Sequence, residues 1–559
     1  MPANSRKLTW RILPSLRLPA WLTAARKQAL RRLVNPLTGS LVVFAVVLAL
    51  LTRESLHANQ GRLVYALDDG YIHMAVAKNL AQHGVWGADR YGFAAASSAP
   101  LWTLFLAAVY AVFGLSEAAP FTLNILFAAL TLGMGWAALR AARVEGWLAF
   151  LLLLAVVGAG ALPLLVFVGM EHALQVFLNL LFLYGFGRLA GGEDSGKAAW
   201  RRLCLLAALA VGVRYEGVFL VAAGSLILAL RKRFGEALGL LLAGCLPILA
   251  FGLFSLSQGG LFLPNTILLK GVAPAVGEMR RSLAALIEQR WNTSRDSLEL
   301  AQLSLAILAA LLLRSRGRWD WLAAANLAYL PTSLLQTFFI GNNYFYRYEA
   351  NLVCAGIILS AAALRELFRR RRELFPNGRF WWLYVIVLGV FAWKPIPHLW
   401  QRAQESLEKI VPATTNIYEQ QYQMGLFLRQ FYQGKTIAAN DIGAINYLAD
   451  IRTVDLYGLS TQAVADLKLA RRYDRQAIAR LAQEQGVDIA MVYDHWYDEY
   501  GGLPRQWLKA GEWKISHNVV CGGDVVSFYA VRQAEAPALR ANLRAFSAQL
   551  PSSVAQFLR

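Results

Sequence analysis

Residues 65–100, YALDDGYIHMAVAKNLAQHGVWGADRYGFAAASSAP, separate the first apolar segment of the 559-residue chain from the second. This stretch is polar and rich in titratable groups, within a sequence that is 57% hydrophobic and only 16% charged. Such a composition is too apolar for a set of soluble domains and is typical of a polytopic membrane protein. The stretch is therefore expected to lie outside the lipid, and the side on which it lies sets the topology of the chain.

Two adjacent carboxylates, Asp68 and Asp69, precede an amphipathic run at residues 70–83. An Asp in this place can cap a helix by accepting hydrogen bonds from its first backbone N–H groups. One cap does not require two acids, however, and Asp69 shares a helix face with His73 at i+4, where the side chains can hydrogen-bond or hold an ion. A structural cap and a chemical role both remain open for this pair.

The distribution of positive charge predicts the topology. The net charge is +20, and most of the excess falls in short loops between apolar runs, where Lys and Arg mark the cytoplasmic side. We therefore attribute the charge to the membrane and expect no nucleic-acid partner. Residues 1–35 carry eight basic side chains and no acid, which predicts a cytoplasmic amino-terminal segment (residues 1–36) that is not a cleavable signal. The loop at residues 65–100 is then periplasmic.

Not every apolar run can be a crossing. The basic clusters all fall inside if residues 99–113 lie at the membrane surface, and if residues 203–230 form two short passes around Arg214-Tyr215-Glu216. The prediction is a membrane domain of about eleven transmembrane helices at residues 37–396, whose first periplasmic loop spans 54–120.

The last part of the chain has a soluble composition, and residues 397–559 are expected to form a periplasmic α/β domain. Strands are predicted at 436–439, 488–493 and 525–531, and a helix at 474–485.

With this topology, acids, bases and aromatic side chains converge on the outer face, whereas the inner loops show only basic clusters. Structural roles are available for several of them. Glu171 could cap a helix, Arg347 could anchor the chain at the head groups, and Arg214 could form an internal ion pair. The candidate site comprises Asp68, Asp69, Tyr71, His73, Lys78, Glu171, His172, Arg214, Glu216, Asn265, Lys270, Tyr344, Tyr346 and Arg347.

These motifs, taken in order, resemble the bacterial GT-C glycosyltransferases, and most closely the mycobacterial arabinofuranosyltransferase-like group. The resemblance covers nearly the whole chain. It departs from the group at Tyr215, where Pro is usual, at His172, where Thr is usual, and at residues 94–98. These departures bear on which sugar is transferred more than on the type of reaction. The matching motifs are Asp68-Asp69-Gly-Tyr-Ile-His, Ser97-Ser98-Ala-Pro-Leu-Trp, Val168-Gly-Met-Glu-His-Ala-Leu, Val213-Arg-Tyr-Glu-Gly, Pro264-Asn-Thr with Lys270, and Asn440-Asp-Ile-Gly-Ala with Val454-Asp-Leu-Tyr-Gly-Leu.

The resemblance implies transfer of a sugar from a polyprenyl-phosphate donor to a glycan, glycolipid or glycoprotein acceptor at the periplasmic face of the bacterial inner membrane. It implies direct displacement with inversion, with Asp68 as general base and Asp69 as its support or alternate. Glu171 would orient the acceptor or the neighbours of Asp68. Cations at Lys270, Arg347 and Arg214 would neutralise the donor phosphate. No cofactor is certain, and the two adjacent acids leave a divalent cation open.

The alternative from another class is a secondary transporter or flippase for a lipid-linked sugar. It would place ionisable residues at mid-membrane depth and break paired helices in matching halves. Apart from Arg214 and Glu216 the apolar runs are free of charge, and no internal repeat is evident. A non-catalytic assembly factor of the cell envelope, with the last domain as its binding module, is a third hypothesis.

Overall fold

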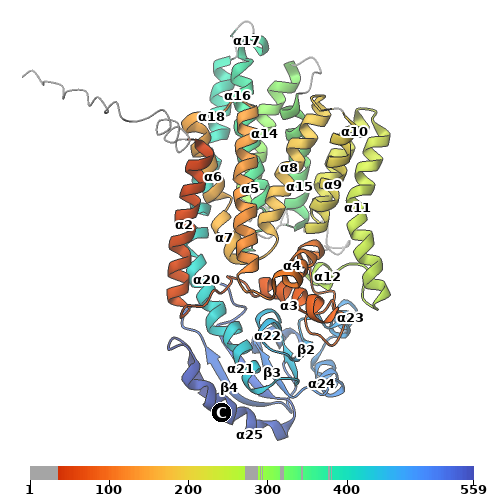
Figure 1. Cartoon of the computed structure of the whole chain (residues 1–559), viewed down its shortest axis with the longest axis vertical. Helices are drawn as coiled ribbons and strands as arrows, with labels where there is room; N and C mark the ends of the chain where they lie inside the picture. Colours follow the sequence, from red (N-terminus) through yellow and green to blue (C-terminus); the bar gives the residue numbers. More distant parts are fainter. Residues whose placement is uncertain are drawn as a thin grey trace, which may run out of the picture.

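The computed structural model describes residues 35–194, 196–270, 288–289, 291–292, 294–314, 320–340, 344–375, 378 and 381–559. A bundle of long helices occupies one end of the molecule, and a smaller domain built on a sheet occupies the other (Figure 1). Short helices, α3 (Asp68–His83), α4 (Pro100–Phe113) and α12 (Asn265–Lys270), lie between them. The predicted class, a polytopic helical membrane protein with a carboxyl-terminal α/β domain, is confirmed.

The helices of the bundle are apolar on their outer surface. On α2, for example, Val42, Val46 and Leu50 are each more than half exposed. Rows of exposed apolar side chains suit lipid rather than water. Seven helices in the described part of the chain are long and apolar enough to cross a membrane, and the total of about eleven stays a prediction. The bundle contains α2 (Pro36–Ala58), α5 (Ala119–Ala141), α6 (Gly146–Ala159), α7 (Leu162–Val168), α8 (His172–Gly191), α9 (Lys197–Val213), α10 (Gly217–Leu230), α11 (Phe234–Ser257), α14 (Arg295–Arg314), α15 (Trp321–Ile340), α16 (Ala350–Arg369), α17 (Arg371–Leu374) and α18 (Trp381–Trp393).

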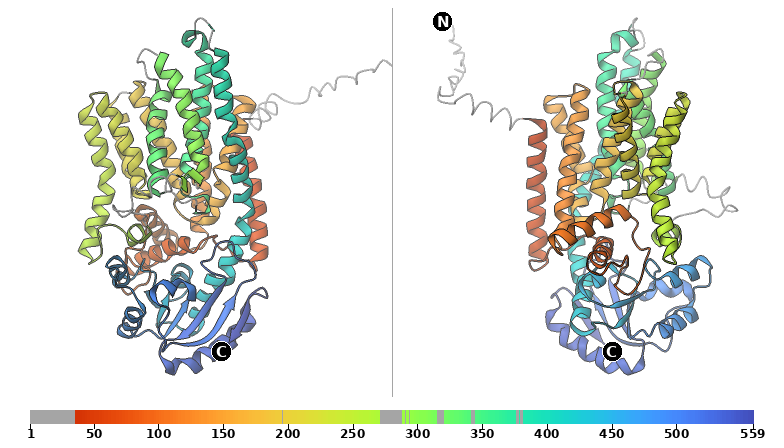
Figure 2. Two further views of the ribbon diagram at one scale, coloured as in Figure 1. Left: turned by 180° about the vertical axis from the view of Figure 1, so that it is seen from behind. Right: turned by 45° about the vertical axis from the view of Figure 1, so that its right-hand side comes forward.

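Two features that the charge pattern predicted are present in the bundle. The segment at 203–230 is a hairpin, in which α9 and α10 pack together and are joined by the turn at residues 214–216. Helix α4 packs against α3 and runs across the bundle axis, at the end of the bundle that faces the sheet domain (Figure 2). This orientation fits a helix at the membrane surface.

The loops with basic clusters contact one another at the end of the bundle remote from the sheet domain. The Arg365 Nε donates to the backbone carbonyl of Arg143 at 3.4 Å, and the Arg233 Nη1 donates to that of Leu189 at 3.3 Å. The basic clusters thus gather at one end of the bundle, as the charge pattern predicts. The expectation that the loops at this end show only basic clusters is wrong, because acids there pair with the bases, as Asp194 does with Arg202 and Glu366 with Arg369. Which end faces the cytoplasm stays a prediction.

The sheet domain is a mixed α/β structure with strand order β2-β1-β3-β5-β4-β6. The first three strands are parallel, and β5, β4 and β6 are antiparallel to their neighbours. Strands β1, β3 and β5 and helix α24 match the prediction; β2, β4 and β6 were not predicted. The elements are β1 (Thr436–Ala439), β2 (Arg452–Asp455), β3 (Ile489–Val492), β4 (Leu508–Lys514), β5 (Val525–Ala530), β6 (Ala555–Leu558), α22 (Gly443–Leu448), α23 (Gln462–Leu469), α24 (Arg475–Glu484) and α25 (Ala536–Phe546).

A run of helices connects the bundle to the sheet domain. Helices α19 (Pro395–Glu408), α20 (Ile410–Ile417) and α21 (Gln423–Phe431) follow α18, so the predicted boundary at 396/397 falls within the run. Helix α19 packs on α6 and α14, and its Arg402 is buried, donating to the carbonyl of Ala159 at 2.6 Å and to the Glu349 carboxylate. Although α19 is polar in sequence, it packs with the bundle because its charge is compensated there.

Candidate active site between the bundle and the sheet domain

Helix α3 carries the acidic pair and lies where the bundle meets the sheet domain. It ends at Gly84, whose φ of 68° forms a left-handed C-cap. Because side chains four residues apart share a helix face, Asp69 and His73 point to one side, toward the bundle. Asp68 and Lys78 contact the sheet domain instead. The two acids that are adjacent in sequence therefore have different surroundings.

Asp68 binds the start of helix α22. Its Oδ2 accepts from the Gly443 N–H at 2.7 Å and its Oδ1 from the Ala444 N–H at 2.8 Å. Lys78 binds the other end of the same helix, because its Nζ donates to the carbonyls of Asn446 at 2.6 Å and Tyr447 at 2.9 Å. A negative charge at the first turn and a positive charge at the last complement the helix dipole. This pair docks the sheet domain onto α3.

The fit at this contact is close. A Cβ on Gly443 would lie 2.1 Å from the backbone oxygen of Asp68, so a larger residue would separate the two helices. Tyr71 is fully buried beside it, where its hydroxyl accepts from the Tyr65 N–H at 3.3 Å and its ring packs against Tyr422. Burial and the nearby Asp441 raise the pKa of Asp68, whereas the two N–H donors lower it.

Asp69 faces the bundle and pairs with Arg347, whose Nη2 lies 2.8 Å from the Asp69 Oδ2. The side chain of Asp69 is 26% exposed, whereas that of Arg347 is only 2% exposed. The Arg347 Nη1 also contacts the sulfur of Met170 at 2.9 Å. A buried arginine thus holds a carboxylate that is partly exposed to solvent.

The ring of Tyr348 connects this pair to a second arginine. The guanidinium of Arg347 lies 4.9 Å from the ring centroid and that of Arg214 lies 5.2 Å from it, both within cation–π range. His172 packs edge-on against the same ring at 5.7 Å. Sequence reasoning missed Tyr348, although it directly follows the candidate residue Arg347 in the chain.

Glu171 is fully buried at the centre of the network. Its Oε1 accepts from the Arg214 Nη1 at 2.7 Å, while the Arg214 Nε donates to Glu216 at 3.0 Å. Its Oε2 lies 3.5 Å from the His73 Nε2. Arg214 is therefore shared between two carboxylates, with a histidine on the far side of one of them.

His73 is anchored on its other ring nitrogen by two hydroxyl groups. The Nδ1 lies 3.1 Å from the Thr103 Oγ1 and 3.2 Å from the Ser97 Oγ. Burial lowers the pKa of His73, against the opposing effect of Glu171, so the ring is expected to be neutral at pH 7. Ser97 stands in a quoted motif, but no sequence signal identifies Thr103.

The structure gathers seven of the predicted site residues into this network and separates the others. Asn265 contacts the sheet domain, where its Nδ2 donates to the carbonyl of Gly458 at 3.3 Å. The Tyr346 hydroxyl accepts from the Lys409 Nζ at 2.8 Å, on the side of α19. The side chains of Lys270 and Tyr344 lie outside the described residues. The network comprises Asp69, His73, Glu171, His172, Arg214, Glu216 and Arg347.

Within the part of the chain that the structure describes, no three His, Cys, Asp or Glu side chains are arranged to hold a metal ion.

Comparisons with known proteins give a partial match in sequence and broad matches in structure. A family model described as a domain of unknown function, DUF8728, matches residues 415–529. No curated protein matches the chain. Solved structures similar to it include ArnT from Cupriavidus metallidurans in the apo state, at 14% identity and a TM-score of 0.49, covering 89% of this chain and 98% of ArnT.

Two further structures are similar over most of this chain. ArnT from the same organism bound to undecaprenyl phosphate has 13% identity and a TM-score of 0.49, covering 89% of this chain and 99% of ArnT. The oligosaccharyltransferase of Archaeoglobus fulgidus, in complex with zinc and sulfate, has 12% identity and a TM-score of 0.43, covering 88% of this chain and 73% of that enzyme.

Proposed function

We propose that this protein is a GT-C-type glycosyltransferase that moves a sugar from a polyprenyl-phosphate donor to a cell-envelope acceptor at the junction of its bundle and sheet domain. The observation that carries the proposal is the Asp69–Arg347 pair, a partly exposed carboxylate held 2.8 Å from a buried guanidinium. It lies at the end of an apolar bundle. A lipid-linked donor needs apolar helices for its tail and polar chemistry at the level of its phosphate, and this arrangement supplies both.

In the proposed reaction a hydroxyl oxygen of the acceptor attacks the anomeric carbon of the donor sugar. The bond between that carbon and the phosphate oxygen breaks, and polyprenyl phosphate leaves with the electron pair. The hydroxyl proton passes to a carboxylate of the enzyme, which acts as general base. One displacement of this kind inverts the anomeric centre. A single carboxylate suffices, and the donor brings its own leaving group.

The contacts favour Asp69 over Asp68 as this base. The family resemblance implies the first acid, but both oxygens of Asp68 accept backbone N–H groups from helix α22. Asp69 is 26% exposed on the side of the charge network. We therefore assign proton abstraction to Asp69, and the docking of the sheet domain to Asp68.

The remaining charges divide between positioning and binding of the donor. Arg214 is bound to Glu171 and Glu216, so it is better suited to hold the network together than to receive a phosphate. By the resemblance, the phosphate is expected to meet Lys270 and Arg347. Glu171 contacts both Arg214 and His73, and so holds these two side chains in position near Asp69 and Arg347.

A transporter or flippase is the alternative from another class. Its coupling groups would lie in the middle of the membrane, whereas the charge network here lies at the end of the bundle, on the α9–α10 turn and on α3 beside the sheet domain. The location of the network is thus better explained by a reaction at the membrane surface than by a path through the membrane.

The direct test is sugar transfer by the purified full-length protein in lipid nanodiscs. Radiolabelled polyprenyl-phosphate sugars, both pentoses and hexoses, are supplied with acceptor from the membranes of the natural host. We expect label in the acceptor with the parent protein and almost none with Asp69→Asn. Movement of the lipid-linked sugar across liposomes without any transfer would overturn the proposal in favour of a flippase.

A further inference from the structure

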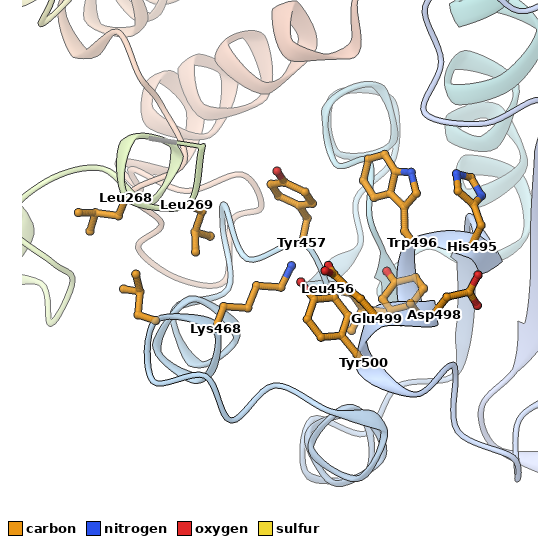
Figure 3. Close-up of a pocket in the computed structure, with 12 residues that line it drawn as sticks. Leu268, Leu269, Leu456, Tyr457, Lys468, His495, Trp496, Asp498, Glu499 and Tyr500 are labelled. Atoms are coloured by element: carbon orange, nitrogen blue, oxygen red, sulfur yellow. The ribbon is translucent and has the colours of Figure 1, made fainter. Parts of the chain in front are cut away.

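A cavity of ≈730 Å³ lies between helix α12 and the sheet domain. Its size is within the range of small-molecule sites. Leu268 and Leu269 of α12 form one wall, and the sheet domain provides the others (Figure 3). None of the residues that the sequence motifs suggested for catalysis lines it. The cavity is therefore distinct from the charge network at Asp69.

The cavity lies at the carboxyl ends of parallel strands, where α/β proteins commonly bind their ligands. Its lining comes from residues 456–457, which directly follow strand β2, and residues 495–500, which follow strand β3. The strand order is β2-β1-β3, so these two loops follow the parallel strands on either side of β1. Ligands in open α/β sheets bind outside the carboxyl ends of the strands.

The lining combines aromatic rings with charged groups. Tyr457, Trp496 and Tyr500 line the cavity, and the Lys468 ammonium lies 4.6 Å from the ring centroid of Tyr457 and 5.2 Å from that of Tyr500 (Figure 3). Glu499 also lines the cavity, next to Tyr500 in the chain. A sugar ring has an apolar C–H face that packs on an aromatic face and a rim of hydroxyls that bond to charged groups. The lining suits a carbohydrate better than a purely apolar ligand, because an apolar ligand would cover the charged groups of Lys468 and Glu499 without forming hydrogen bonds to them.

Residues that line the cavity also pack against helix α3, which carries the acidic pair. Leu269 and Tyr457 pack on an apolar cluster that includes Ile72, which lies one helical turn after Asp69. On the other wall, Asn265 at the start of α12 binds the Gly458 carbonyl, in the loop after β2. A glycan held in the cavity is thus bound by elements that also border the reaction site.

We infer that this cavity is a subsite for sugar residues of the glycan acceptor, which it holds beside the site of transfer. The inference rests on the proposed function for the identity of the acceptor, but the binding of glycan by the cavity is independent of any transfer. The aromatic rings Trp496 and Tyr500 carry the contact with the sugar faces, and Lys468 selects hydroxyl or acidic substituents at the rim.

The test is direct binding in the absence of donor. The probes are maltohexaose and the oligosaccharides released by mild acid from the membranes of the natural host. Binding to the full-length protein in nanodiscs is followed by saturation-transfer NMR. We expect signals from the host oligosaccharides with the parent, and a loss of affinity of about tenfold with Trp496→Ala or Tyr500→Ala. Phe557→Ala, which removes a half-exposed aromatic ring on the edge strand β6, should bind like the parent.

If an alanine variant fails to fold, binding is measured instead on Tyr500→Phe and Lys468→Met, which keep most of the side-chain volume and remove only the hydroxyl or the charge. Equal binding by the parent and all folded cavity variants, or no binding by the parent, overturns the inference. In the transfer assay the cavity variants should raise the acceptor KM and leave the donor KM unchanged. Glycan binding without any transfer would refute the proposed function alone, and transfer with unchanged acceptor KM would refute the subsite alone.

Discussion

The two polar faces of helix α3 differ in what their charges meet. On the side of the sheet domain, Asp68 and Lys78 meet backbone groups at the two ends of helix α22. On the side of the bundle, Asp69 and His73 meet the charged side chains Arg347 and Glu171. Four titratable residues within eleven positions of the sequence thus serve two interfaces of different chemistry.

The difference matters because backbone groups and side chains respond differently to a reaction. A peptide N–H is fixed by its helix and keeps the same charge, so an acid bound to two of them acts as a cap. An arginine side chain can exchange one anion for another, and an acid paired with it can release that partner to substrate. The bundle face is therefore the face on which chemistry is expected, and the sheet-domain face is expected to contribute to stability.

The largest expected effect is on the bundle face. Asp69→Asn keeps the size of the side chain and removes the proton acceptor, so turnover should fall by about 10²–10⁴-fold. Single-turnover rates with saturating polyprenyl-phosphate sugar measure this, and unfolding followed in parallel separates the loss of the base from the destabilisation caused by removing the carboxylate partner of the buried Arg347. Normal turnover in this variant would move the base to another residue.

The second prediction concerns the buried centre of the network. Glu171→Ala leaves the Arg214 guanidinium buried with one carboxylate instead of two, and should destabilise the protein by about 3–5 kcal/mol, as other broken buried pairs do. Denaturant unfolding in detergent measures the loss. The matched control is Glu193→Ala, which removes an exposed partner 3.9 Å from Arg188 and should cost less than about 1 kcal/mol. Equal costs for the two variants would show that the network adds no special stability.

The third prediction concerns the sheet-domain face. Lys78→Met retains the aliphatic stem but removes two charge-assisted hydrogen bonds to the end of helix α22, and should destabilise the docked sheet domain by about 1.5–3 kcal/mol. Thermal unfolding followed by tryptophan fluorescence measures the shift. Lys435→Met, at an exposed lysine of the same domain, serves as the control and should change little. A large loss of turnover in Lys78→Met with an unchanged unfolding midpoint would instead give Lys78 a direct role in the reaction.

The smallest effect is expected for the acid that the family resemblance favours. Both oxygens of Asp68 accept N–H groups, and Asn has only one acceptor oxygen, so Asp68→Asn should lose one hydrogen bond as well as the charge–dipole part of the contact, together about 1–2 kcal/mol. Turnover should stay within a few-fold of the parent. If turnover instead collapses in Asp68→Asn and survives in Asp69→Asn, the roles of the two acids are exchanged.

Much of the architecture could be predicted because it depends on local patterns. Apolar runs and basic clusters predicted the helical bundle, the short hairpin at Arg214 and the gathering of the basic clusters at one end of the bundle. Three strands and helix α24 of the sheet domain followed from alternation and periodicity. The short edge strand β6, with its mostly exposed pattern, carries no such signal and was missed.

The sequence by itself determined which residues face the polar end of the bundle, because their chemistry excludes them from lipid. Only the tertiary structure decided how they pair. Asp68 and Asp69 are equivalent by composition and position, and they differ because the Gly443–Ala444 backbone, 375 residues away in the chain, reaches one of them and Arg347 reaches the other. Contacts at such separations depend on the packing of whole helices, which no local pattern encodes.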